Sequence, residues 1–78
     1  MSFITVKVFT KALFNNYDVG RCPICCDGKY VGDTNEKGEL TFSIEGGGVR
    51  FISASCGEVG SGGAKASPGE TVKIEVRR

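Results

Sequence analysis

The sequence predicts an all-β domain, a small antiparallel β-sandwich of six to seven strands, and three observations support this. Apolar residues alternate with polar ones in several short segments, as half-buried strands require. Turns rich in glycine or proline separate these segments, and no segment has the apolar period of an amphipathic helix. The chain of 78 residues is long enough for one domain, spanning 1–78, with a thin core.

The first strand is expected over residues 3–10. Its apolar face consists of Ile4, Val6 and Val8. Residues 11–20 have weaker periodicity and contain Asn15-Asn16 and Asp18, so a loop is expected there. The side chains expected to cover the core from this loop are Phe14, Tyr17 and Val19.

The next strand is expected over residues 21–26. Its alternation places three residues on one face, namely Cys22, Ile24 and Cys26. Pro23 lacks a main-chain N–H to donate to a neighbouring strand, so we expect this strand at a sheet edge or with an irregularity at Pro23.

The stretch from Asp27 to Glu45 has the clearest pattern of strand, turn and strand in the sequence. Asp27-Gly28 suits the positive φ angles of a tight hairpin turn, and residues 35–38 form a second polar turn that ends at Gly38. The following strand alternates, and its apolar face consists of Leu40, Phe42 and Ile44.

The segment after the glycines at 46–48 is expected to be a strand, and the sequence allows either of its faces to point toward the core. Either Val49 and Phe51 point inward, or the set Ile52, Ala54 and Cys56 does. A bulge between Phe51 and Ile52 would turn both sets inward. Residues 57–63 contain too many glycines for a good strand and are expected to form a flexible loop.

The end of the chain is expected to contain two strands separated by a turn. Residues 64–66 are expected to form a short strand, and Ser67-Pro68-Gly69-Glu70 fits a type II turn. In the final strand, residues 71–78, the inward side chains are Val72, Ile74 and Val76.

The order of these turns and strands resembles that of a known family of domains. Asp27-Gly28-Lys29 follows the first strands, a polar turn and strand extend from Gly32 to Phe42, and Pro68-Gly69-Glu70-Thr71 precedes the last strand. This order resembles the carboxypeptidase regulatory-like domains, which are transthyretin-like (prealbumin-like) β-sandwiches. The resemblance covers nearly the whole chain and implies an Ig-like or transthyretin-like sandwich that serves as a compact, non-catalytic module. The histidines and the Tyr-Arg-Gly-Ser ending of the hydrolase branch are missing, as is a last-strand Asn for a Lys–Asn crosslink.

The cysteines allow three interpretations. A zinc site would use all four, namely Cys22, Cys25, Cys26 and Cys56. In an extended strand, however, Cys22 and Cys25 point to opposite faces about 10 Å apart, so zinc requires a turn at 22–26. By analogy with sandwich domains whose facing sheets share a disulfide, Cys22 would bond to Cys56, and Cys26–Cys56 is the second choice. The third interpretation, as strong as a disulfide, is that all four cysteines are reduced. Cys25 is then exposed, and the other three thiols are buried as small apolar groups.

Composition narrows the function. Ten basic and nine acidic residues give a net charge of +1, and the longest basic run is Arg77-Arg78, so nucleic acid is not an expected partner. The chain has no histidine, which excludes Cys-His and Ser-His pairs within it, and we expect no enzyme and no cofactor. The expected partner is protein, either the parent chain or a second copy that pairs at the first strand or the Pro23 strand.

The sequence does not indicate in which cellular compartment the protein works. No apolar run is long enough for a membrane span, and the first residues lack the apolar region of a signal peptide. The chain is expected to be either a complete small protein or a domain of a larger one, exported and surface proteins included.

Overall fold

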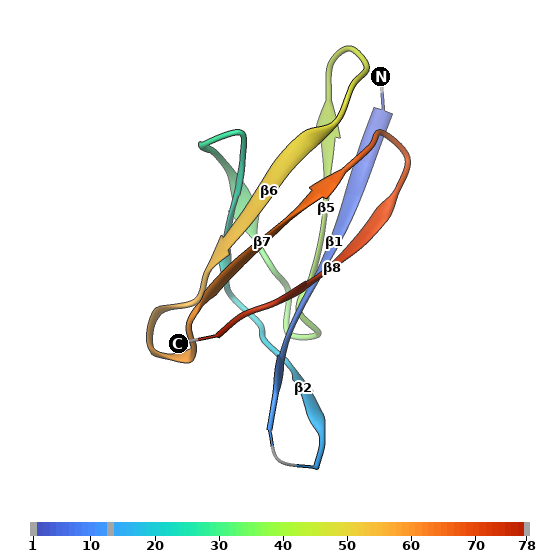
Figure 1. The fold of residues 1–78 in the computed structure, drawn as a ribbon. Coiled ribbons are helices and arrows are strands. Elements are labelled where there is room, and N and C mark those ends of the chain that lie inside the picture. Colours follow the sequence, from blue (N-terminus) through green and yellow to red (C-terminus); the bar gives the residue numbers. More distant parts are fainter. Residues whose placement is uncertain (1, 13, 78) are drawn as a thin grey trace.

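The computed structural model describes residues 2–12 and 14–77, and its regular structure is strands with one short 3₁₀ turn (Figure 1). The strands are β1 (Ser2–Lys11), β2 (Asn16–Asp18), β3 (Pro23–Cys26), β4 (Lys29–Asp33), β5 (Glu39–Ile44), β6 (Arg50–Ser55), β7 (Ser61–Ala66) and β8 (Thr71–Glu75). The 3₁₀ turn covers Gly57–Val59. The predicted all-β class is confirmed, and the described part has eight strands rather than six or seven because β2 forms within the expected loop.

The first sheet is organised around β1. Strand β5 pairs antiparallel with the first part of β1, and β2 pairs antiparallel with its last three residues. On the other side of β1, β8 pairs with it in parallel, from Thr5 opposite Thr71 to Phe9 opposite Glu75. The strands of the two sheets are therefore mostly antiparallel, as expected, and the parallel pair joins the two ends of the chain.

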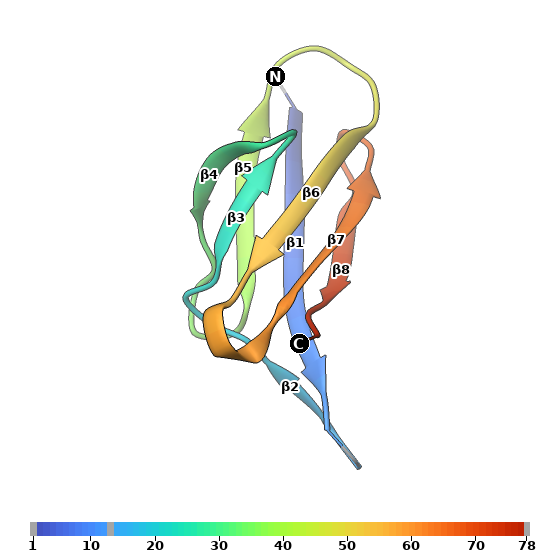
Figure 2. The same cartoon turned by 60° about the vertical axis from the view of Figure 1, so that its left-hand side comes forward.

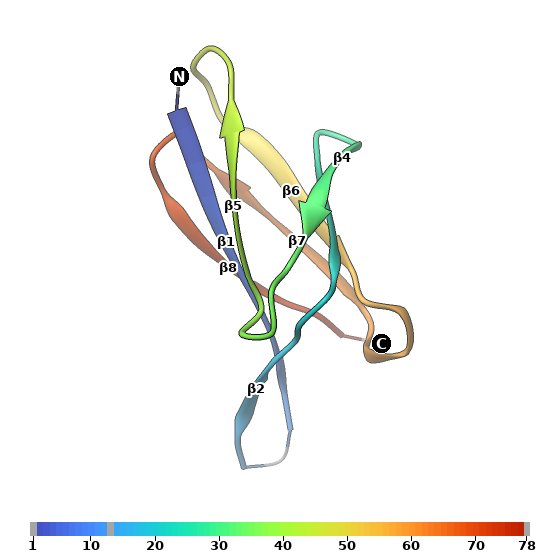
Figure 3. The ribbon, with the colours of Figure 1, turned by 180° about the vertical axis from the view of Figure 1, so that it is seen from behind.

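The second sheet has the order β4-β3-β6-β7 and is antiparallel throughout. Figure 2 shows this sheet in front of β1 and β5, and Figure 3 shows the first sheet from the opposite side. Strands β4 and β5 are neighbours in sequence but belong to different sheets, so the turn between them carries the chain from one layer to the other.

Apolar side chains of both sheets form one shared core, an arrangement consistent with a small β-sandwich. The first sheet contributes Ile4, Val6, Val8, Phe42, Ile44 and Ile74, and the second sheet contributes Ile24, Ile52, Ala54 and Ala66. The alternation read from the sequence in β1, β5 and β8 is thus the alternation between core and solvent. Of the three alternatives left open for β6, the structure shows Ile52 and Ala54 inward and Val49 and Phe51 exposed, so no bulge turns both sets inward.

The two sheets approach each other closely along β7 and β8. Ser61 and Arg77 exchange main-chain hydrogen bonds, N to O, of 2.9 and 3.0 Å. A Cβ atom on Gly62 would overlap the carbonyl oxygen of Glu75, so only glycine allows this approach. The expected flexible loop at 57–63 is therefore wrong at its end, because Ser61 and the next two residues belong to β7.

The predicted turns are confirmed. Asp27 and Gly28 both have positive φ, 52° and 84°, as a type I′ hairpin between β3 and β4 requires. Asn35 accepts hydrogen bonds at its side-chain oxygen from the N–H groups of Lys37 and Glu39. In the turn before β8, the Glu70 N–H donates to the Ser67 carbonyl oxygen at 3.1 Å.

The two strands expected to pair with a second copy of the chain are not edge strands. Strand β3, which contains Pro23, lies between β4 and β6, and β1 lies between β8 and the pair β5 and β2. Pro23 is tolerated in an interior strand because it is the first residue of β3, and the ladder between β3 and β6 begins only at Ile24. An irregularity does occur next to it, since the register with β4 shifts between Ile24 and Cys25.

Candidate functional site

The end of β1 and the whole of β2 form a hairpin that projects from the two sheets, and we call residues 9–18 the arm. Pairing of β1 with β5 ends at Lys7 and its pairing with β8 ends at Phe9, so the strand that pairs with β1 beyond Phe9 is β2. Figures 1 and 3 show the arm extending past the rest of the molecule. Leu13 lies outside the described residues.

The aromatic side chains of the arm are exposed. Phe14 is 90% exposed and Tyr17 is 54% exposed, so the expectation that they cover the core is wrong. Val19, the third side chain expected there, is buried. The physical reason is the β1–β2 pairing, which carries Phe14 and Tyr17 past the end of the core and brings only Val19 back to it.

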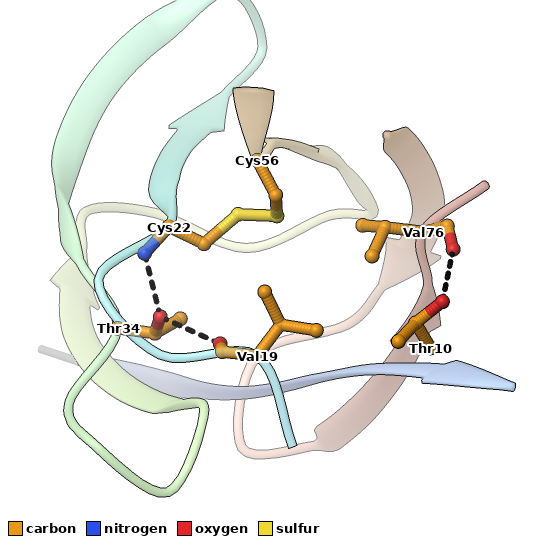
Figure 4. Close-up of a disulfide and its surroundings, with 6 residues drawn as sticks. All are labelled: Thr10, Val19, Cys22, Thr34, Cys56 and Val76. Carbon is orange, nitrogen blue, oxygen red and sulfur yellow. Dashed lines mark hydrogen bonds between the residues drawn. A yellow bond between two sulfur atoms is a disulfide. The ribbon is translucent and has the colours of Figure 1, made fainter. Parts of the chain in front are cut away.

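The root of the arm is tied into the core by hydrogen bonds (Figure 4). The hydroxyl of Thr34, which is 3% exposed, accepts from the Cys22 N–H at 2.8 Å and donates to the Val19 carbonyl oxygen at 3.1 Å. On the other strand of the arm, the Thr10 hydroxyl donates to the Val76 carbonyl oxygen at 3.1 Å. The arm therefore combines a fixed root with an exposed aromatic tip.

A hollow of about 300 Å³ lies at the base of the arm on the outer face of the first sheet. It is lined by Lys7, Phe9, Lys11, Asn16, Asp18 and Lys73. Lys7 lies 3.6 Å from the Asp18 carboxylate, and Lys11 lies 3.8 Å from that of Glu75. The Arg77 guanidinium donates to the Glu75 carboxylate and lowers the pKa of Glu75, which keeps this partner of Lys11 ionised. The hollow thus presents lysine ammonium groups beside an apolar floor.

The structure pairs Cys22 with Cys56 in a disulfide, the pair we expected first, with Cα atoms 4.8 Å apart. The analogy that suggested it does not hold, because the bond joins neighbouring strands of one sheet rather than facing sheets. Ile24 lies opposite Ala54 in the β3–β6 ladder, and continuing this register by two residues places Cys22 opposite Cys56. The second choice, Cys26–Cys56, is wrong.

The two free cysteines do not gather into a cluster with the bridge. Cys26 is packed against the core, whereas its neighbour Cys25 points to the outer face of the second sheet. Burial raises the pKa of the Cys26 thiol, and the Asp27 carboxylate raises it further. The four-cysteine zinc set cannot form while Cys22 and Cys56 are bonded to each other, and residues 2–12 and 14–77 contain no group of three metal-ligating side chains.

Sequence reasoning missed the arm as a functional feature. The available signal was the stretch from Phe14 to Tyr17, where two aromatic residues flank Asn15-Asn16. Asparagine favours turns, and aromatic residues beside a turn at the end of a long strand can lie beyond the core. Only the pairing of β1 with β2 shows that they do.

The chain matched no model of a known protein family, and a search of curated proteins gave no match either.

Proposed function

We propose that this chain is a non-catalytic module that acts through protein contacts, as an accessory domain or an assembly subunit, and that it docks through the arm. The observation that carries the proposal is the 90% exposure of Phe14 at the end of a projecting hairpin. Burying a phenylalanine side chain in a partner is worth about 1.5–3 kcal/mol, and aromatic residues are common at the centres of protein interfaces.

The fixed root of the arm also supports docking. Hydrogen bonds from Thr10 and Thr34 hold the two strands of the arm where they leave the core. A partner therefore meets a preorganised hairpin, and less conformational entropy is lost on binding than with a free loop.

The proposal of a non-enzymatic role rests on chemistry in the sequence. The chain has no histidine to activate a serine or cysteine nucleophile, and no acid–base motif was recognised among its nine carboxylates. Membership of the carboxypeptidase regulatory-like or transthyretin-like domains is part of the proposal, supported by the order of turns and by the all-β fold.

No described helix is long and apolar enough to cross a bilayer.

Site-specific photocrosslinking tests the proposed function. The photoreactive amino acid p-benzoylphenylalanine replaces Phe14 in the protein expressed in its native cells, and the matched control replaces Val59, a residue outside the arm that is 39% exposed. We expect a discrete protein adduct from position 14 that position 59 does not give, and we expect Tyr17→Ser to reduce its yield. The same adducts from both positions, or none from position 14, would overturn docking through the arm.

A further inference from the structure

The outer edges of the sheets differ in how they are protected against pairing with another strand. Native proteins protect edges with charges, bulges, short strands or coverage. Strand β4 has an irregular register with β3, β2 has only three residues, β8 carries Lys73, and β7 carries Lys65 and is held to the chain end by Ser61. These features leave β5 as the least protected edge of the described chain.

The sequence of β5, ELTFSI, has none of these protections beyond its first residue. Its outward side chains after Glu39 are Thr41 and Ser43, which are small and uncharged. Its inward side chains are apolar, and it contains no lysine, arginine, proline or glycine. A regular strand of this composition suits the addition of another strand.

The hydrogen-bond pattern identifies which main-chain groups of β5 face outward. The Val8 N–H donates to the Gly38 carbonyl oxygen at 2.7 Å, which makes this opposed pair a hydrogen-bonded one. Such pairs alternate along an antiparallel ladder, so the even-numbered residues of β5 point their N–H and C=O groups at β1. The N–H and C=O groups of Thr41 and Ser43 therefore point away from β1, toward the free edge.

Both ends of this free edge are closed by the protein itself. Before it, the N–H and C=O groups of Glu39 bond to the side chain and main chain of Asn35. After it, Arg50 Nη2 donates to the Glu45 carbonyl oxygen. The edge thus offers two donors and two acceptors in one short segment, on Thr41 and Ser43.

A groove of about 520 Å³ opens beside the end of this edge, between the two sheets. Its apolar walls come from Val31, Ile44 and the half-buried Cys26. Its rim carries two basic residues, Lys29 and Arg50, and two acidic residues, Asp27 and Glu45. The groove is large enough for an apolar side chain that enters from the position of an added strand.

We propose that β5 binds an extended peptide segment of another protein as an additional antiparallel strand. Two residues of that segment lie opposite Thr41 and Ser43 and exchange main-chain hydrogen bonds with them, with their side chains on the outer face. The residues opposite Phe42 and Ile44 point inward, and the one opposite Ile44 enters the groove. The peptide class is therefore one with small polar and apolar side chains in alternation. This site is separate from the arm and does not depend on docking there.

A second copy of this chain fits the edge less well. Pairing β5 with itself across a two-fold axis, with Thr41 opposite Ser43 of the second copy, satisfies every free group but sets Glu39 opposite the second copy's Glu45 twice. Like charges directly opposite each other destabilise a sheet. The inward side chains of a second β5 would also remain in their own core and leave the groove empty.

The probes are acetylated and amidated peptides of the pattern Lys-Thr-Xaa-Thr-Xaa-Thr-Lys, with valine, leucine or phenylalanine at Xaa. We expect at least one to bind the ¹⁵N-labelled protein and to shift the amide signals of Thr41 and Ser43 more than those of β7 and β8. N-methylation of the threonine amides should abolish binding, whereas N-methylation of the Xaa amides, which face away from β5, should preserve it.

Two variants of the protein test the same hydrogen bonds by altering β5 instead of the peptide. Thr41→Pro removes a free donor without removing a main-chain bond to β1, and the only bond to β1 that it loses is the exposed hydroxyl–hydroxyl bond to Thr5. The fold should therefore persist while peptide affinity falls at least about tenfold, and Ser43→Pro should act alike. The proposal is overturned if no peptide binds the unaltered protein, or if binding survives both proline variants in folded protein. It is also overturned if sedimentation shows that the protein already dimerises through β5.

Discussion

Reducing the Cys22–Cys56 disulfide should remove a large part of the stability of this domain. The bonded residues are 34 positions apart. In the chain-entropy account, a closed loop of that length lowers the entropy of the unfolded state and stabilises the fold by about 3.8 kcal/mol at 25 °C. A domain of 78 residues has a total stability of about 4–12 kcal/mol, so the reduced protein should retain between almost none of it and about 8 kcal/mol.

Urea denaturation with and without dithiothreitol measures this effect. With a urea m-value of about 1 kcal/mol/M for so small a chain, the unfolding midpoint should fall by roughly 3–4 M on reduction. Reduction changes no side-chain volume, so a cavity does not confuse the result. Cys25→Ser, at a free cysteine that points outward, is the matched control and should leave both midpoints nearly unchanged. Equal midpoints in the two conditions, or four titratable thiols in the unfolded protein without reductant, would refute the reasoning.

Three further predictions concern the core and the free thiols. Thr34→Val should cost about 2–3 kcal/mol by urea denaturation, because it leaves the Cys22 N–H and the Val19 carbonyl oxygen unpaired, while Thr34→Ser should recover most of the loss. Gly62→Ala should cost about 1–3 kcal/mol because its Cβ meets the Glu75 carbonyl oxygen, whereas Gly47→Ala, with open space around it, should be nearly neutral; equal costs would contradict the close approach of β7 and β8. In the Cys25→Ser variant, Cys26 should react with iodoacetamide at pH 8 more slowly in the folded than in the unfolded protein, because its raised pKa leaves less thiolate; equal rates would contradict the burial of that thiol.

The strands with strong alternation could be predicted from sequence. In β1, β5 and β8 each local pattern of apolar residues agrees with the face that the core requires, and the Asp27-Gly28 turn has a backbone requirement that its residues reveal directly. These features depend on neighbouring residues alone.

The rest depends on contacts between distant residues. Nothing near Ser61 or Gly62 indicates a strand, since the reason for glycine there is the Glu75 carbonyl oxygen in β8. The parallel pairing of β1 with β8 joins the two ends of the chain, and it makes β1 a central strand. The exposure of Phe14 follows from the pairing of β2 with β1, because an aromatic residue in a loop can equally well cover a core.

The free edge of β5 is the structural feature on which the proposed peptide binding depends. Amide hydrogen exchange of the isolated protein tests it residue by residue. We predict that the Thr41 and Ser43 amides exchange fast while those of Leu40, Phe42 and Ile44 are protected by β1. Protection at all five residues would mean that another strand covers this edge, and fast exchange at Phe42 would mean that β5 does not pair with β1 as described.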